Sequence, residues 1–258
     1  MIKVVAIGDV HGQWAAVWQV LKAATAANNK LEPSPAVKEG RFRVVFMGDL
    51  VHYKDKNAYA QAINEEPYDP NNPVHLKRAA KAQIRELYRF KDYVDAANGN
   101  VEIILGNHDE SALNHKYELA TRGGLKHNEF NEKRGGMPLP DDLRDWVASF
   151  KREILIHDVQ FAHAGPTTGL MQFDDFFYHD KDTKKWWYTK PELLIQTGHR
   201  FGVYGHTVMK EGVYIDKNHH FAMIDALEHS QFLEMILDDN RLDYRVMQFK
   251  STRAYRSD

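Results

Sequence analysis

Cysteine is absent from this chain of 258 residues. Its absence excludes disulfides, zinc–thiolate sites and a thiol nucleophile, and it fits a reducing compartment. Any metal ion must therefore be held by His, Asp, Asn or Glu. Apolar runs of about 18 residues are also absent, and the opening MIKVVAIGD is too short an apolar run for a signal peptide. We therefore expect no membrane association and a cytoplasmic location.

Net charge is also small. The 34 lysines and arginines nearly balance the 36 acidic residues, which leaves a formal charge of -2. This balance gives no strong signal for nucleic-acid binding. A hydrophobic content of 43% with 12% aromatic residues is enough for a sizeable core. Because no shift in composition divides the chain, we expect a single domain over residues 1–258.

Apolar runs rich in β-branched residues recur along the chain, and each ends at glycine or a polar residue. Predicted strands cover residues 1–7, 43–47 and 101–105, and predicted helices cover residues 13–27 and 74–97. Strands that alternate with helices in this way indicate an α/β fold. The polar residues stand at the strand ends, where such a sheet usually presents its active site.

The second half of the chain adds further predicted strands, at 153–163 and 201–204. Four more, from 212 to 249, are expected to form a run of antiparallel pairings. Between the two halves, residues 120–140 contain two Gly-Gly pairs and two prolines. We interpret about 111–150 as a cap-like excursion that could cover the site.

Five short motifs with polar residues each follow a predicted strand. In chain order they are Gly8-Asp9-Val10-His11-Gly12, Gly48-Asp49, Gly106-Asn107-His108-Asp109, His163-Ala164-Gly165 and Gly205-His206-Thr207. One such motif alone is more often a turn or a packed histidine, but five in series indicate a shared site. Oxygen donors mixed with imidazoles suit Mn, Fe, Zn, Co or Ni better than calcium. The series therefore predicts a metal site.

Two cations that share one carboxylate need an aspartate close to both and further ligands on each side. We assign Asp49 as this bridge. The remaining ligands are then Asp9 and His11 for the first metal, and Asn107, His163 and His206 for the second. Metal ions about 3.5–4 Å apart can activate a bridging water, hold phosphate oxygens and stabilise in-line attack. Such a site hydrolyses phosphate esters without a phosphoenzyme, which agrees with the lack of a cysteine or a G-x-S-x-G serine motif.

The motifs GDVHG, GD, GNHD, HAG and GHT, in this order, resemble the signature of the calcineurin-like metallophosphoesterases. The resemblance extends from Asp9 to about Asp225. It implies a four-layer α/β sandwich of two mixed β-sheets flanked by helices. It also implies the ligand assignment above, with two divalent or trivalent ions among which Mn is expected to support activity in vitro. His108 is implied as a general acid or a phosphate-binding group.

Val208 stands where many phosphodiesterases of that family have the second histidine of Gly-His-X-His. The chain therefore resembles the branch of protein Ser/Thr phosphatases and diadenosine tetraphosphate hydrolases. The resemblance implies a phosphatase in which a metal-bridging hydroxide attacks a phosphomonoester of a phosphoprotein or a nucleotide. Two alternatives stay open, which are a hydrolase of dinucleoside polyphosphates or nucleotides, and a non-catalytic metal-binding scaffold.

That branch typically reads GDxVDRG at its second motif, whereas this chain has His52 and Tyr53 in place of the Asp and the Arg. The missing Asp would orient His108, and the missing Arg would bind phosphate. Asp109, to which we assign a catalytic role, or Asp55 is the candidate to orient His108 instead.

A second phosphate-binding arginine, often found after a tryptophan before the last motif in that branch, is also missing, and Trp187-Tyr188-Thr189-Lys190 stands there. Lys190 and Arg200 are the first candidates to bind substrate, with Arg122 and Arg134 as further ones. The aromatic segment 173–188 either packs in the core or stacks on a nucleobase. The histidines outside the motifs, His52 and His127 among them, are expected to have ordinary surface or packing roles.

Overall fold

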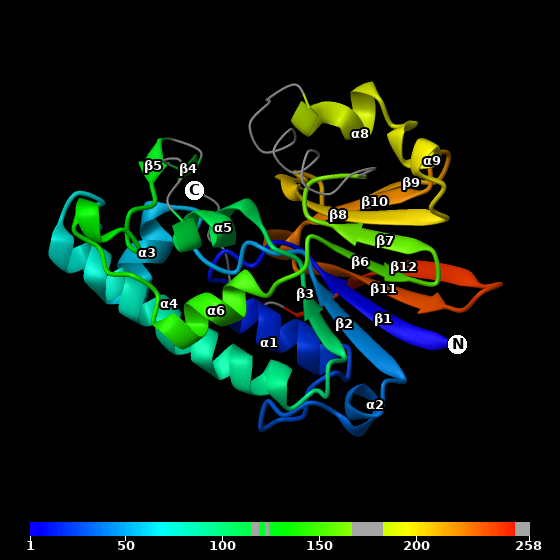
Figure 1. The fold of residues 1–258 in the computed structure, drawn as a ribbon, viewed down its shortest axis with the longest axis horizontal. Coiled ribbons are helices and arrows are strands. Elements are labelled where there is room, and N and C mark those ends of the chain that lie inside the picture. Colours follow the sequence, from blue (N-terminus) through cyan, green and yellow to red (C-terminus); the bar gives the residue numbers. More distant parts are fainter. Residues whose placement is uncertain (115–118, 122–123, 167–182, 251–258) are drawn as a thin grey trace.

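Two five-stranded mixed β-sheets form the frame of the computed structural model, which describes residues 1–114, 119–121, 124–166 and 183–250 (Figure 1). The strands of the first sheet, in spatial order, are β12 (Leu242–Gln248), β11 (Gln231–Leu237), β1 (Ile2–Ile7), β2 (Phe42–Phe46) and β3 (Val101–Ile103). The neighbours β1, β2 and β3 run parallel, whereas β11 is antiparallel to β1 and β12. The three parallel strands therefore end at one edge of the sheet.

The second sheet has a similar arrangement of parallel strands. Its order is β6 (Glu153–Ile156), β7 (Val159–Ala162), β8 (Phe201–Val208), β10 (Phe221–Asp225) and β9 (Tyr214–Asp216). The central strands β7, β8 and β10 run parallel, and β6 and β9 are antiparallel to their neighbours. A separate pair consists of β4 (Ala120–Thr121) and β5 (Leu125–Lys126). Each large sheet thus has its own set of parallel strand ends.

Helices cover the outer face of each large sheet, as Figure 1 shows. Those beside the first sheet are α1 (Trp14–Ala23), α4 (Pro73–Asp95) and α6 (Asp141–Ala148), and those beside the second are α8 (Trp186–Thr189) and α9 (Leu193–Thr197). The other helical elements are α2 (Pro35–Lys38), α3 (Lys56–Ile63), α5 (Asn107–Asn114), η1 (Glu132–Arg134), η2 (Thr183–Lys185) and η3 (Leu227–His229). The order helix, sheet, sheet, helix confirms the expected four-layer α/β sandwich.

Alternating side chains on β1 explain how both faces of the first sheet are buried. Val5 and Ile7 belong to the hydrophobic cluster formed with the helices, whereas Val4 and Ala6 belong to the cluster between the two sheets. Successive residues of a strand point to opposite faces, so a strand covered on both sides is apolar throughout. This is why β1 and β2 read as continuous apolar runs in the sequence.

The last four strands differ from the expected run of antiparallel pairings. The pairs β9–β10 and β11–β12 are antiparallel, but β10 pairs in parallel with β8 and lies in a different sheet from β11. The chain changes sheets through η3. Apolar patterning identifies a strand but not its partner, because pairing depends on contacts between distant parts of the sequence.

The segment 111–150, interpreted above as a cap-like excursion, contains regular structure. It includes β4, β5, η1 and α6, and Leu143 and Val147 of α6 join the main core. His127 and Phe130 of the same segment are buried. The segment therefore contributes to the fold, and its role as a cap stays a prediction.

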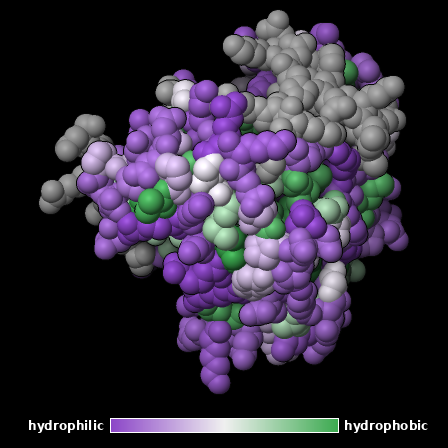
Figure 2. Space-filling model, turned by 60° about the vertical axis from the view of Figure 1, so that its left-hand side comes forward, coloured by the Kyte–Doolittle hydropathy of each residue, from purple (hydrophilic) through white to green (hydrophobic). Residues whose placement is uncertain are grey.

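The helices of the described ranges include none that is both long enough and apolar enough to span a bilayer. On the face shown in Figure 2, hydrophobic side chains occur in small groups between hydrophilic ones. Exposed apolar side chains such as Val74, Leu155 and Ile195 belong to different elements, which is common on protein surfaces.

The substitution Phe90→Ala is expected to lower the free energy of unfolding by about 3–5 kcal/mol. Phe90 is fully buried on α4, and its ring centroid lies 4.7 Å from that of Phe46 and 5.3 Å from that of Trp14. Val74→Ala, at a position 61% exposed on the same helix, is the control and should change stability by less than about 0.5 kcal/mol. Urea unfolding measures both, and equal effects would contradict this account of the core.

Candidate metal centre

The motif residues meet where the parallel strands of both sheets end. Asp9, Asp49 and Asn107 come shortly after β1, β2 and β3, while His163 follows β7 and His206 lies near the end of β8. The backbone N–H of His206 donates to both Asp9 carboxylate oxygens, at 3.0 and 2.9 Å. The His163 ring nitrogen Nδ1 lies 2.5 Å from the Met47 carbonyl oxygen. These hydrogen bonds join the two sheets at the site.

Two motif glycines are needed because ligands of the site lie against them. A Cβ on Gly106 would lie 2.1 Å from Asp49 Oδ1, and a Cβ on Gly205 would lie 2.2 Å from Asp9 Oδ1. Real Cβ atoms do not approach other atoms so closely, and in each case the obstacle is a buried carboxylate. Only glycine allows the chain to pass this close to Asp49 and Asp9.

Four residues of the site have strained backbone conformations. His11, Asp49, His52 and His206 have φ values of 44°, 50°, 66° and 62°. Positive φ is uncommon for residues other than glycine, and its cost persists only where the surrounding structure enforces it. Such outliers cluster at functional sites, and here they set the direction of the side chains.

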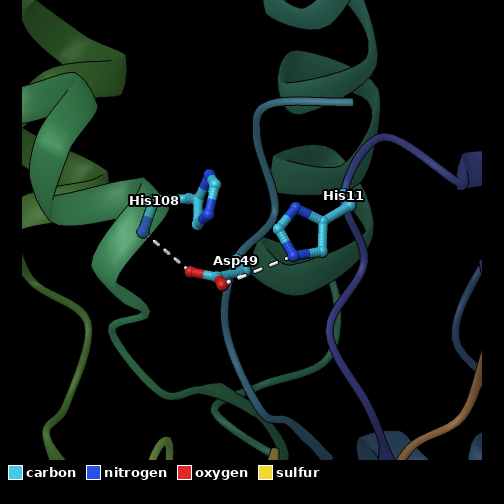
Figure 3. Close-up of side chains that lie close together, drawn as sticks. All are labelled: His11, Asp49 and His108. Atoms are coloured by element: carbon cyan, nitrogen blue, oxygen red, sulfur yellow. Dashed lines mark hydrogen bonds and ion pairs between the residues drawn. The ribbon is translucent and has the colours of Figure 1, made fainter. Parts of the chain in front are cut away.

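Asp49 lies at the centre of the group. Its Oδ2 is 3.5 Å from His11 Nε2 and 3.4 Å from His163 Nε2. Its Oδ1 accepts a hydrogen bond of 2.8 Å from the backbone N–H of His108, in the first turn of α5. Figure 3 shows His11 and His108 on either side of the Asp49 carboxylate. This position fits the predicted role of Asp49 as a shared ligand.

Two sets of side chains could each hold a metal ion, and Asp49 belongs to both. The first set is His11, Asp49 and His108, and the second is Asp49, His163 and His206, with the potential ligand atoms of each set within 4.8 Å of one another. Asn107 Oδ1 joins the second set, at 3.1 Å from His163 Nε2 and 3.0 Å from His206 Nδ1. Buried imidazoles with oxygen donors fit a first-row transition metal.

Asp9 is surrounded by buried charges that sequence reasoning did not include. Burial raises the pKa of Asp9 well above its usual value, and the nearby Asp225 carboxylate raises it further. Asp225 pairs with Lys54, whose Nζ lies 2.9 Å from Asp225 Oδ1 and 3.5 Å from Glu228 Oε1. Asp225 ends β10, so it carries the same signal of a polar residue at a strand end that identified the other motifs.

The pKa values in the group show how its charges interact. Burial raises the pKa of Asp49, but the imidazoles of His163 and His108 outweigh this effect and hold it well below the usual value. Burial lowers the pKa of His163, yet the carboxylates of Asp49 and Asp9 raise it to about 10. Without a metal ion, His163 is therefore protonated and offsets part of the buried negative charge. A cation bound by this imidazole would displace the proton.

The ring of His108 faces other histidines. His52 Nδ1 lies 3.1 Å from His108 Nδ1, and the His127 ring stacks on His52 with centroids 4.7 Å apart. Burial lowers the pKa values of both His52 and His108 well below the usual range, and the neighbouring imidazoles add to this effect. Ordinary surface or packing roles were expected for His52 and His127, and the structure packs both rings against His108. The replacement of Asp by His at position 52 was the available signal.

A buried hydrogen-bond network holds His52 and His127 in place. Gln83 Oε1 accepts from the backbone N–H of His52 at 2.7 Å, and Gln83 Nε2 donates to Glu129 Oε1 at 2.9 Å. The Tyr59 hydroxyl donates to the same Glu129 oxygen and lies 2.8 Å from His127 Nδ1. Hydrogen-bonded networks of this kind hold their members in one arrangement.

The two aspartates considered as partners of His108 make other contacts. Asp109 Oδ1 accepts from the backbone N–H of Leu50 at 2.8 Å, and Asp109 Oδ2 accepts from that of Gly106 at 3.2 Å. Burial, together with the charge of Asp49, raises the pKa of Asp109 to about 7. Asp55 caps α3 by accepting from the backbone of Ala58. The structure places His52, rather than either carboxylate, against the His108 ring.

Arg200 lies away from the metal ligands. Its guanidinium donates to the carbonyl oxygens of Asp238, Asp239 and Arg241 in the turn between β11 and β12. Arg200 precedes the first residue of β8, while His206 lies near its other end, so roughly 20 Å of strand separates them. The structure therefore does not bring Arg200 to the site.

Two further residues proposed to contact substrate are exposed, and these are Lys190 directly after α8 and Arg134 on η1. Arg122 lies outside the described residues. Trp186 is buried, and its indole N–H donates to the Ala164 carbonyl at 3.0 Å, so this aromatic residue packs in the core. The aromatic residues at 173–178 lie outside the described ranges.

Comparison with known proteins shows a family and a fold. The family model described as calcineurin-like phosphoesterase matches residues 2–244. No curated protein matches the chain. Among solved structures, the cold-active protein-tyrosine phosphatase of a psychrophilic Shewanella species is 18% identical with a TM-score of 0.57, covering 96% of this chain and 81% of that one. A protein serine/threonine phosphatase from Saccharomyces cerevisiae is 14% identical with a TM-score of 0.52, covering 98% and 82%. At these identities the likeness shows the fold alone.

Binding of Mn²⁺ at about pH 8 is expected to release about one proton from His163. With a pKa of about 10 in the metal-free protein, His163 is protonated at this pH, but a metal ligand must be neutral. Raising the pH toward 10 removes the proton that competes with the metal ion for His163, so the affinity for metal should increase. Calorimetric titration in two buffers of different ionisation enthalpy counts the protons. His163→Asn should release about one proton fewer, and equal release from both proteins would contradict the assignment.

Proposed function

The chain belongs to the calcineurin-like phosphoesterase family, and on this premise we propose that it is a metal-dependent phosphatase that hydrolyses phosphomonoesters. The observation that carries the proposal is the position of Asp49, which belongs to two sets of potential metal ligands where the strand ends of both sheets meet. Bound metal ions would activate a water molecule and bind the phosphate oxygens. Fold and family together support a phosphoester hydrolase.

We assign two roles to the side chains of the site, which are metal binding and assistance to the leaving group. Asp49 is the ligand shared by two ions, with Asn107, His163 and His206 on one side and His11 on the other. Asp9, predicted with His11 to bind the first ion, also accepts from the backbone N–H of His206 through both carboxylate oxygens. The ligand set thus comes from both sheets, which makes the site sensitive to the correct packing of the whole fold.

His108 is the group proposed to assist departure of the leaving oxygen. Its Nδ1 lies against His52 Nδ1, so Nε2 is the nitrogen left to donate to that oxygen. The low pKa of His108 favours a neutral ring, and a neutral ring protonated at Nε2 must accept at Nδ1. His52 is then the donor, and the network of Gln83 and Glu129 keeps it in place.

The substitution Asp49→Asn is expected to lower kcat/KM for p-nitrophenyl phosphate by at least about 100-fold, because it removes the charge that both metal ions share. Protein stripped of metal and reloaded with Mn²⁺ would be assayed with this monoester and with bis-p-nitrophenyl phosphate. We expect the monoester to be preferred. Asp141→Asn, at an exposed site on α6, is the matched control and should behave as the unchanged protein.

Two other outcomes of this assay would favour different functions. Preference for the diester would place the protein among phosphodiesterases. Stoichiometric metal binding without turnover of either ester would favour the non-catalytic scaffold. A hydrolase of dinucleoside polyphosphates would use the same ligands, and activity toward diadenosine tetraphosphate compared with a phosphopeptide separates it from a protein phosphatase.

The substitution His52→Asp is expected to move the acid-side decline of kcat to higher pH, because the proposed role uses a neutral His108 ring. A carboxylate against His108 favours the protonated imidazole, which raises its pKa. His52→Ala removes the partner of Nδ1 and should lower kcat by about 10-fold or more without this shift. His157→Ala, in the exposed turn between β6 and β7, is the control. Identical pH profiles for His52→Asp and the unchanged protein would contradict the proposed contact.

A further inference from the structure

A buried carboxylate that has no role yet in the proposed reaction lies two contacts away from His108. Glu129 is fully buried, and within the described ranges its Oε2 has no hydrogen-bond partner and no cation pairs with it. Burial raises the pKa of Glu129, and a buried carboxylate without a cation is costly to the fold. Groups of this kind are frequent at functional sites. The contacts of Glu129 indicate which function it serves.

Two series of contacts lead from Glu129 Oε1 to the His108 ring, and the first passes through Gln83. Gln83 Nε2 donates to Glu129 Oε1 at 2.9 Å, and Gln83 Oε1 accepts from the backbone N–H of His52 at 2.7 Å. His52 Nδ1 then lies 3.1 Å from His108 Nδ1. Gln83 and His52 are both buried, so water does not compete for these hydrogen bonds.

The second series passes through Tyr59 and His127. The Tyr59 hydroxyl donates its only hydrogen to Glu129 Oε1, so it can only accept from His127 Nδ1, 2.8 Å away. Burial lowers the pKa of His127 to about 3, so this ring is neutral and carries its proton on Nδ1. The His127 ring stacks on His52 with centroids 4.7 Å apart and meets the His108 ring edge to face at 5.1 Å. One carboxylate oxygen thus orients both rings that contact His108.

Glu129 and His127 belong to a loop, residues 127–137, that is closed tightly on itself. The backbone N–H of Met137 donates to the Glu129 carbonyl oxygen at 2.9 Å. A Cβ on Gly136 would lie 2.4 Å from the same oxygen, so only glycine fits there. This glycine belongs to one of the two Gly-Gly pairs of the segment, and it allows the close packing that holds Glu129 in a fixed position.

We propose that Glu129 is a positioning residue for His108, in place of the aspartate that the GDxVDRG motif would supply. It acts through His52 on one side and through Tyr59 and His127 on the other. This inference rests on the proposed function, in which His108 assists departure of the leaving oxygen. Without Glu129 the two neighbouring rings lose the contacts that orient them, so His108 donates to the leaving oxygen less efficiently.

The identity of the leaving group distinguishes this role from a purely structural one. Assistance from an acid matters more when the leaving oxygen is more basic. Phenol is a weaker acid than p-nitrophenol, so phenyl phosphate depends more on His108 than p-nitrophenyl phosphate does. A variant in which His108 is poorly oriented should therefore lose kcat mainly for phenyl phosphate, while KM stays the same. A general loss of structure would affect both esters alike.

The substitution Tyr59→Phe tests the second series of contacts in the Mn²⁺-loaded protein. It removes the hydroxyl that joins Glu129 to His127 and keeps the ring that contacts Tyr53 and Tyr68. We expect kcat for phenyl phosphate to fall by about 10-fold, and kcat for p-nitrophenyl phosphate to change by less than about 3-fold.

A tyrosine hydroxyl elsewhere on the surface provides the matched control. Tyr88→Phe removes an exposed hydroxyl of α4 that donates to Asp142 Oδ1 at 2.9 Å. This variant should leave both kcat values unchanged, because no contact in the described ranges connects Tyr88 with the histidine rings.

Substitutions of Glu129 itself test both series at once. Glu129→Leu removes both hydrogen bonds and should lower the ratio of kcat for phenyl phosphate to kcat for p-nitrophenyl phosphate by about 10-fold or more. Glu129→Gln keeps an oxygen that can accept from Tyr59 and Gln83, so it should keep this ratio within about 3-fold of that of the unchanged protein. Glu132→Gln, at an exposed position of η1, is the control.

Metal binding and the two esters together separate this inference from the proposed function. Neither Tyr59 nor Glu129 is a proposed ligand, so calorimetric titration with Mn²⁺ should give the same stoichiometry for Tyr59→Phe as for the unchanged protein. An equal loss of kcat for both esters, no loss for either, or loss of metal binding in Tyr59→Phe would overturn this inference and leave the proposed function standing. No turnover of either ester by the unchanged protein would overturn the proposed function, and this inference with it.

Discussion

Close contact between the end of β1 and the end of β10 is the constraint on which the site depends. A Cβ on Gly8 would lie 2.0 Å from the Ile224 carbonyl oxygen, so only glycine allows the two sheets to approach this closely. The same approach lets Asp9 accept from the backbone of His206 and places Asp225 beside it. With the sheets further apart, ligands from the second sheet would not reach those from the first.

The close contact between the two sheets also buries several charged groups near one another, which is unfavourable in a protein interior. Asp9, Asp49 and Asp225 are buried together, and the compensating cations are Lys54 and a protonated His163. Buried carboxylates of like charge destabilise the folded chain unless cations or hydrogen bonds offset them. A metal ion bound at the proposed ligands would supply that compensation and replace the proton on His163. Strained backbone at the ligands fits the same picture of a site organised for binding rather than for stability.

The two residues that stand in place of the Asp and the Arg of the GDxVDRG motif are both buried in the structure. Tyr53, which replaces the phosphate-binding arginine, is buried against Gly12 and Tyr59 and belongs to a hydrophobic cluster. His52, which stands in place of the aspartate, contacts His108, and its backbone N–H donates to Gln83, which in turn donates to Glu129.

The sequence by itself determined the fold class and the residues that gather at the strand ends, because local patterns specify strands, turns and their order. Six predicted ligands, from Asp9 to His206, come together for this reason. Only the tertiary structure decided that β10 pairs with β8, that His52 faces His108, and that Arg200 lies at the far end of its strand. These features depend on contacts between segments distant in the chain and on the direction of each side chain, which local patterns do not specify.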